Sequence, residues 1–130
     1  MSEPLFLSFE DILVFHRRSL AEFGGIDGIR DEGLLQSAVM QPQHTFFYGG
    51  GDLFDVAAAY AFHIAEAQAF LDGNKRTAVA AALAFLHMNG MKRVLDWTQI
   101  YEAMIAIAER RMNKNDLAAL FRRLTSEAKI

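Results

Sequence analysis

Residues 57–86, AAAYAFHIAEAQAFLDGNKRTAVAAALAFL, decide the fold of this chain. The stretch consists of two apolar, alanine-rich segments on either side of a turn at Gly73. Helices that are apolar on nearly every side belong at the centre of a bundle, and alanine side chains allow two backbones to approach closely. The stretch therefore predicts a central pair of helices, over residues 52–68 and 74–90.

Four further helices are predicted around this pair. They share apolar residues at helical spacing, and they are residues 9–23, 30–41, 97–108 and a last helix that begins at Asn113 or Asn115. Ser8 and Asp96 are typical N-caps, and the second helix is expected to end before Pro42. No strand pattern, sequence repeat or interdomain linker interrupts the series. The sequence predicts a single all-α domain over residues 1–130, a bundle of about six helices.

Bulk composition excludes several classes of protein. Of the 130 residues, 52% are hydrophobic and 22% are charged, which is typical of a globular domain. A formal charge of −3 argues against direct binding of nucleic acid, and a chain without cysteine has no disulfide, thiol nucleophile or cysteine zinc site. Residues 1–4 do not begin a secretory signal, and the apolar run 78–86 is too short to span a bilayer. We therefore expect a cytoplasmic protein with no membrane partner.

The turn between the two central helices carries charge in an unfavourable position. Lys75 and Arg76 lie in the first turn of a helix, where the helix dipole is positive and backbone N–H groups are free. An ordinary turn is one interpretation, but a local conflict of this kind is typical of a functional site. A bound anion resolves the conflict, because amides from Gly73 onward cradle it while the two cations neutralise it. Asp72 beside this cradle suits a Mg²⁺ ion carried by nucleotide phosphates.

The sequence Phe-Leu-Asp-Gly-Asn-Lys-Arg-Thr over residues 70–77 resembles the signature loop of the death-on-curing (Doc) toxins, the short branch of the Fic superfamily. Residues 28–35, residues 52–55 with the helix after them, and residues 80–90 also resemble segments of this family, in the same order. The resemblance covers most of the chain up to about Gly90. It implies a Fic-type bundle whose central helix–loop–helix carries the phosphate-binding motif.

The resemblance also implies an activity and its partners. Fic enzymes transfer part of a nucleotide, most often AMP, to a protein hydroxyl. Doc toxins have a lysine where adenylylating relatives have a second loop glycine, and they act as kinases; Lys75 is that lysine. The implied reaction moves a phosphoryl group from ATP, with Mg²⁺, to a threonine of elongation factor Tu and stops translation. The implied partner is an antitoxin whose disordered C-terminal segment folds into a groove on the toxin.

The family motif assigns a role to each loop residue. Asp72 is expected to hold the metal ion, and Asn74 to order the loop. Lys75 and Arg76 are expected to hold the nucleotide phosphates. The predicted phosphate-binding set is Gly73, Asn74, Lys75, Arg76 and Thr77.

Gln68 departs from the family motif, which has at this position a histidine that acts as general base. A glutamine amide orients a hydroxyl but does not take its proton at ordinary pH, and loss of a general base typically costs about 10²- to 10⁴-fold in rate. A loose phosphoryl-transfer transition state depends less on a base than acyl transfer does. His63 lies five residues earlier, about 140° around the helix from Gln68. We interpret His63, together with His16 and His87, as packing residues.

Other features have two interpretations. Residues 43–51 are expected to form a loop, and its aromatic residues 46–48 are either a mobile flap that positions a target peptide, as in Fic proteins, or an anchor for the loop. Trp97 and Tyr101 are expected in the core. Arg110 and its neighbour Arg111 are expected on a solvated face.

Four functions therefore remain open from the sequence. The favoured one is a Doc-type toxin kinase, impaired by Gln68. The alternatives are a nucleotide-binding Fic-fold protein with little or no catalysis, a protein AMP-transferase, and a helical interaction module in which the loop is only a turn.

Overall fold

The computed structural model describes residues 3–127, and these residues fold into six α-helices. The helices are α1 (Phe9–Phe23), α2 (Glu32–Phe47), α3 (Leu53–Ala67), α4 (Asn74–Met88), α5 (Trp97–Ala108) and α6 (Lys114–Glu127). No strand occurs among the described residues, so the all-α prediction is confirmed. Of the domain predicted over residues 1–130, Met1, Ser2 and residues 128–130 lie outside the described part.

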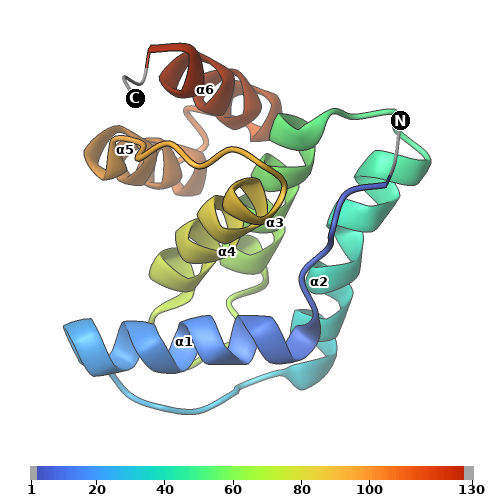
Figure 1. Ribbon diagram of the computed structural model, residues 1–130. Helices are drawn as coiled ribbons and strands as arrows, with labels where there is room; N and C mark the ends of the chain where they lie inside the picture. The colour runs from blue at the N-terminus through green and yellow to red at the C-terminus, as the bar shows by residue number, and fades with distance from the viewer. Residues whose placement is uncertain (1–2, 128–130) are drawn as a thin grey trace.

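The predicted central pair is α3 and α4, which run side by side through the middle of the molecule (Figure 1). α2 and α6 pack against α3, while α1 crosses below α4 and α5 lies beside it. Residues 56–61 of α3 are completely buried, as a helix covered on all sides must be. Tyr60 is the largest of them, and its hydroxyl oxygen accepts a hydrogen bond of 2.8 Å from the Leu7 N–H, which ties the N-terminal segment to the core.

Polar side chains cap the start of every helix except α4. Ser8, Asp31, Asp52 and Asp96 accept hydrogen bonds from first-turn N–H groups of α1, α2, α3 and α5. At the start of α6, the side chains of Asn113 and Asp116 each accept a hydrogen bond of 2.9 Å from the other residue's N–H. Asn113, and not Asn115, is therefore the N-cap of the last helix. The N-cap of α4 is Gly73, which has no side chain that could accept a hydrogen bond from the first turn.

The prediction that the second helix ends before Pro42 is wrong, because α2 continues to Phe47. Pro42 lacks an N–H, so the carbonyl of Ala38 loses its helical partner. The helix continues because Pro42 is buried together with Leu35, Ala38 and Val39 on one face of α2. Burial of this face outweighs the local cost of the proline.

The predicted loop 43–51 is correspondingly shorter, and its aromatic residues anchor the chain. The rings of Phe46 and Phe47 lie 6.1 and 5.8 Å from the ring of Phe6. These residues lie where α2 leads into the start of α3, at the opposite end of α3 from the loop before α4 (Figure 1). The contacts of Phe46 and Phe47 agree with the anchored interpretation, while Tyr48 is 86% exposed, and the segment lies away from the loop 68–73 (Figure 1).

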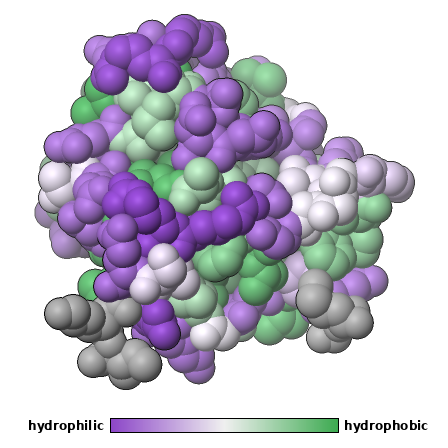
Figure 2. All heavy atoms as spheres, turned by 90° about the horizontal axis from the view of Figure 1, so that it is seen from above, coloured by the Kyte–Doolittle hydropathy of each residue, from purple (hydrophilic) through white to green (hydrophobic). Residues whose placement is uncertain are grey.

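One face of the molecule is predominantly polar (Figure 2). Hydrophilic side chains cover most of the face seen in Figure 2, with smaller apolar areas between them. None of the helices in residues 3–127 is long and apolar enough to cross a membrane.

Candidate phosphate-binding site

The loop between α3 and α4, residues 68–73, is held in place by a segment distant in sequence. Ile29 and Phe70 form an isolated antiparallel bridge. The Arg30 N–H donates a hydrogen bond of 2.6 Å to the carbonyl of Ala69, and the Arg30 guanidinium donates to the carbonyl of Gln68. The connection between α1 and α2 therefore lies along the loop and satisfies its backbone groups.

Asn74 closes the loop from the other side. Its side-chain oxygen accepts a hydrogen bond of 3.0 Å from the Phe70 N–H, and its side-chain nitrogen donates one of 3.0 Å to the Phe70 carbonyl. The Phe70 ring is buried. The same side chain thus satisfies both backbone groups of a residue that is fixed in the core, which makes the loop rigid.

His16 of α1 supports the loop from below. Its ring stacks on the ring of Phe70, with centroids 3.8 Å apart and planes 9° from parallel. Its Nε2 lies 2.9 Å from the Asp72 carbonyl oxygen, so Nε2 carries the proton and donates it. A side chain at Gly73, which has a φ of +79°, would lie 3.6 Å from this ring. The interpretation of His16 as a packing residue is therefore incomplete, because the ring also fixes the backbone beside Asp72.

The N-terminus of α4 has the properties of an anion site. Gly73 is the N-cap and makes no side-chain capping bond. The N–H groups of the first turn, at residues 74–76, accordingly have no partner within the helix. Lys75 and Arg76 are in this turn, with no acidic residue to balance them. Free amides, the positive end of the helix dipole and two cations together favour an anion of high charge.

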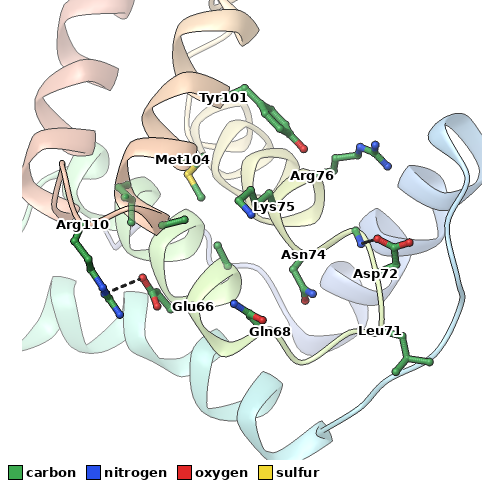
Figure 3. A pocket seen from close by; sticks show the side chains of 14 residues that line it. Glu66, Gln68, Leu71, Asp72, Asn74, Lys75, Arg76, Tyr101, Met104 and Arg110 are labelled. Carbon is green, nitrogen blue, oxygen red and sulfur yellow. Dashed lines mark hydrogen bonds and ion pairs between the residues drawn. The ribbon is translucent and has the colours of Figure 1, made fainter.

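The same helix end opens onto a cleft of about 410 Å³. This volume is within the range of small-molecule sites. The lining residues come from α3, the loop, α4 and α5, and Figure 3 shows Asp72 and Arg76 at one end of the cleft and Glu66 with Arg110 at the other. Lys75 lies between these ends. A cleft with a cationic floor and apolar residues of α5 on one wall suits a ligand that has both phosphates and a ring system.

The carboxylate of Asp72 fits an ion that arrives with the phosphates. Its two oxygens accept hydrogen bonds from the N–H groups of Gly73 and Ile26, at 2.9 and 3.3 Å. Each carboxylate oxygen has a second acceptor site, so the group still has capacity for a cation. Within residues 3–127 no three acidic or histidine side chains gather to form a metal cage. One carboxylate beside a phosphate site is the donor set typical of Mg²⁺ bound by a nucleotide.

Comparisons with known proteins agree with this geometry. The family model described as Fic/DOC matches residues 6–86, which include α1, α2, α3, the whole loop and all of α4 except its last two residues. The chain belongs to the Fic/DOC family. It is 41% identical over 120 residues to a protein of Mycolicibacterium smegmatis named Toxin Doc, with 88% of each chain covered. It is 31% identical over 123 residues to Protein kinase doc of Escherichia phage P1, with 94% of this chain and 97% of that protein covered.

Within this Fic/DOC fold, six of the seven predicted site residues line the cleft. They are Gln68, Asp72, Gly73, Asn74, Lys75 and Arg76. Thr77 differs: it is completely buried, and its hydroxyl oxygen has no hydrogen-bond partner in the described structure. Thr77 is in the second turn of α4 and faces the core, so its side chain does not reach a ligand in the cleft. Its assignment to the phosphate-binding set is therefore corrected.

Gln68 is at the rim of the cleft in a strained conformation. It is the C-cap of α3, with φ 45° and ψ 42°, a left-handed conformation that costs a residue other than glycine about 1 kcal/mol. Among the described residues, only Gln68 and Arg110 combine a side chain with a positive φ, and both line this cleft. At Arg110 this conformation belongs to the C-terminal cap of α5, where the Arg111 N–H donates to the carbonyl of Ala106, so only the strain at Gln68 indicates a functional site.

His63 does not replace the missing histidine. It is absent from the cleft lining and lies beside α6, with its Nε2 3.2 Å from the Lys114 ammonium. Burial and the neighbouring charge of Lys114 lower the pKa of His63 to about 4. His63 is thus neutral at ordinary pH and serves packing, as expected from its position on the helix.

Sequence reasoning missed several contributors to the site. Tyr101, expected in the core, is half-buried and lines the cleft. Arg110 is on a solvated surface, as expected, but it also lines the cleft. Arg30 and His16 fix the loop, although each had an ordinary interpretation in the sequence. No local pattern marks these residues, because each reaches the loop from an element far away along the chain.

Proposed function

We propose that this chain is a Doc-type toxin that transfers a phosphoryl group from ATP to a hydroxyl of a translation factor resembling elongation factor Tu. The proposal includes a cytoplasmic location, where such factors work. The observation that supports it best is the uncapped start of α4, where Lys75 and Arg76 face a cleft beside Asp72. The names Toxin Doc and Protein kinase doc, carried by relatives that match nearly the whole chain, favour kinase over AMP transfer.

The residues present divide the work of binding a nucleotide. The amides of residues 74–76 and the side chains of Lys75 and Arg76 would hold the terminal phosphates and neutralise charge as it develops. Asp72 would hold Mg²⁺, which supplies further neutralisation of the phosphates when bound. In the transfer, the target hydroxyl oxygen bonds to the γ-phosphorus, the bond from that phosphorus to the β–γ bridging oxygen breaks, and ADP leaves.

Gln68 limits the rate of this reaction. It lines the cleft, where its side-chain oxygen can accept a hydrogen bond from the attacking hydroxyl. It does not take the proton, which therefore passes to solvent or to a phosphate oxygen. We expect catalysis slower than that of a histidine enzyme by about 10²-fold or more. The same residue is the observation that favours the second candidate function, a nucleotide-binding protein with negligible catalysis.

A second cleft is suited to the antitoxin. It has a volume of about 460 Å³ and lies between α1, α4 and the segment before α5. Its lining combines exposed apolar side chains, among them Phe23, Val94 and Trp97, with arginines of α1 and α4. We propose that an antitoxin segment binds here through an apolar face flanked by acidic residues, folding as it binds. Arg76 lines both clefts, so this segment would lie directly behind the nucleotide site.

The deciding experiment incubates the chain with Mg²⁺, purified elongation factor Tu and ATP labelled on the γ-phosphate. Gln68→His and Lys75→Met variants are measured in parallel, and Lys92→Met, an exposed lysine outside both clefts, is the matched control. We expect the unmodified chain to label the factor slowly, the Gln68→His variant to label it about 10²-fold faster, and the Lys75→Met variant not to label it.

The remaining outcomes separate the alternatives. Label only with Gln68→His would support the second candidate, an intact binding site without its base. A parallel reaction with ATP labelled on the α-phosphate detects AMP transfer. No label on the factor from either nucleotide, with either the chain or Gln68→His, would rule out this target and this activity.

A further inference from the structure

We propose that Glu66, oriented by Arg110, binds the ribose hydroxyls of the nucleotide and so selects ribonucleotides in the cleft. The inference rests on the proposed function, because it assumes that a nucleotide occupies the cleft. It assigns a specificity-determining role to two residues that lie outside the loop motif.

The position of Glu66 relative to the anion site fits a nucleotide. Glu66 is in the last turn of α3, and α3 packs antiparallel against α4, whose first turn binds the phosphates. The axes of packed helices are roughly 8–10 Å apart, a separation that a phosphate chain followed by a ribose can span. Figure 3 shows Glu66 and Arg110 together at the end of the cleft opposite Asp72 and Arg76.

The chemistry of Glu66 fits a pair of hydroxyl groups. Its Oε1 lies 3.4 Å from Nη1 of Arg110, which is long for a charge-assisted hydrogen bond. Its Oε2 has no partner among the residues that the structure describes, although two thirds of the side chain is shielded from solvent. A carboxylate is an acceptor only, and acidic residues bind the adjacent hydroxyls of ribose in other nucleotide sites. The lining therefore presents a half-shielded acceptor that a ribose 2′-hydroxyl can satisfy.

Arg110 makes a carboxylate tolerable in a site for phosphates. A lone negative charge at Glu66 would repel a polyphosphate, and the adjacent guanidinium offsets that repulsion. Arg110 directly follows the C-cap of α5 and has a φ of +64°, the left-handed conformation that often ends a helix. The Arg111 N–H closes this cap with a hydrogen bond of 2.8 Å to the carbonyl of Ala106, which fixes the backbone from which the guanidinium reaches Glu66. Ile107 and Ala108, in the last turn of α5 just before Arg110, also line the cleft and give it an apolar wall at this end.

The experiment measures binding by calorimetry with Mg²⁺ present, using ATP, 2′-deoxyATP and inorganic tripolyphosphate as probes. Three proteins are compared: the unmodified chain, the Glu66→Gln variant and the control variant Glu102→Gln. Glu102 is an exposed residue of α5 that does not line the cleft. We expect the chain and the control to bind ATP about tenfold more tightly than 2′-deoxyATP. Glu66→Gln is expected to bind both nucleotides with the weaker affinity, and tripolyphosphate as the unmodified chain does.

Three results would overturn the inference. An equal affinity of the unmodified chain for ATP and 2′-deoxyATP would do so, as would a preference for ATP that survives in Glu66→Gln. With GTP as a fourth probe, a preference between ATP and GTP that changes in Glu66→Gln while ribose selection stays would assign Glu66 to the base instead. If the unmodified chain binds ATP and tripolyphosphate in any of these cases, the proposed function is not contradicted. If it binds neither of these two probes, both the proposed function and this inference are overturned.

Arg110→Ala gives an independent measurement that does not depend on the Glu66 variant. Its side chain is 78% exposed, so its removal is not expected to affect folding. We expect ATP binding to weaken several-fold and tripolyphosphate binding to weaken less, because both probes lose the charge that offsets Glu66 but only ATP has a ribose at this end of the cleft. Equal weakening of both probes would contradict a role at the ribose end of the cleft.

Discussion

His16 supports the site through two separate contacts, and substitutions can separate them. His16→Phe keeps a ring to stack on Phe70 but removes the hydrogen bond to the Asp72 carbonyl. We expect this variant to lose about 1 kcal/mol in free energy of unfolding and to need several-fold more Mg²⁺ for ATP binding, because Asp72 is no longer held. His16→Ala removes both contacts and is expected to cost about 2–3 kcal/mol.

Urea denaturation measures the first effect, and a Mg²⁺ titration of ATP binding measures the second. The titration tests positioning, since a purely structural residue would change stability without changing the Mg²⁺ requirement. An unchanged Mg²⁺ requirement in folded His16→Phe would mean that the histidine does not set the position of Asp72.

At the scale of single residues, the sequence predicted the members of the loop better than their surroundings. Asp72, Gly73, Lys75 and Arg76 were predicted from local chemistry and Asn74 from the family resemblance, and all five line the cleft. Thr77 was assigned wrongly because its side chain points along the buried face of α4, a direction that depends on helix phase within the bundle. His16 and the connection between α1 and α2 hold the loop through tertiary contacts, and no local sequence pattern indicates this role.

At the scale of elements, the start of α3 combines a cap with an ion pair. Asp52 accepts hydrogen bonds from the N–H groups of Phe54 and Asp55, and its carboxylate also binds Arg122 of α6, with a closest distance of 3.0 Å. Partial burial raises the pKa of Asp52, but hydrogen bonds from Arg122 and from the Asp55 backbone outweigh this effect and hold it below 3.8. The ionised carboxylate therefore stabilises the folded state.

Two substitutions separate the cap from the ion pair. Asn is also a good N-cap, so Asp52→Asn removes mainly the charge and is expected to cost less than about 1 kcal/mol at pH 7. Asp52→Ala removes the cap as well and is expected to cost about 1 kcal/mol more.

The pH dependence of this effect follows from the direction of the shift. A carboxyl with a folded-state pKa below 3.8 contributes stability above that pH and loses the contribution as the pH falls through the folded value. The difference between the unmodified chain and Asp52→Asn in urea denaturation is therefore expected to shrink between pH 5 and pH 2. A constant difference over this range would exclude the ion pair as its source.

The α2 helix shows where element prediction reaches its limit. Proline is a reliable signal of helix termination in an exposed segment, and it led to a boundary before residue 42. In the structure the helix continues through Pro42, because this residue and three others form one buried face and the aromatic rings that follow pack on Phe6. Burial of this face in the tertiary structure thus outweighs the local tendency of proline to end a helix.

At the scale of the whole molecule, the two clefts lie on either side of Arg76, and the second one predicts the antitoxin contact. Val94 lines that cleft and is 92% exposed, so Val94→Glu is expected to fold normally. A glutamate there would repel an acidic segment and disturb its apolar contact. We expect at least tenfold weaker binding of the C-terminal segment of the neighbouring antitoxin, measured by calorimetry.

Met40→Glu is the matched control, because Met40 is also exposed and apolar but lies on α2, outside both clefts. It is expected to bind the segment as the unmodified chain does. Equal binding by Val94→Glu would place the antitoxin elsewhere, and weakening by both variants would indicate a general effect of charge.

The sequence by itself determined the helical class of this protein, the buried central pair and the charged turn between its members for which we propose anion binding. These properties are encoded locally, in the periodicity of apolar residues, in glycine and asparagine at a helix junction, and in two cations at a helix start. Only the tertiary structure decided what surrounds the turn. The stack of His16 on Phe70, the bridge from Ile29 to Phe70 and the Glu66–Arg110 pair join residues that are 54, 41 and 44 positions apart in the sequence. Such contacts depend on how the helices pack, and helix packing depends on the shape of the complete core.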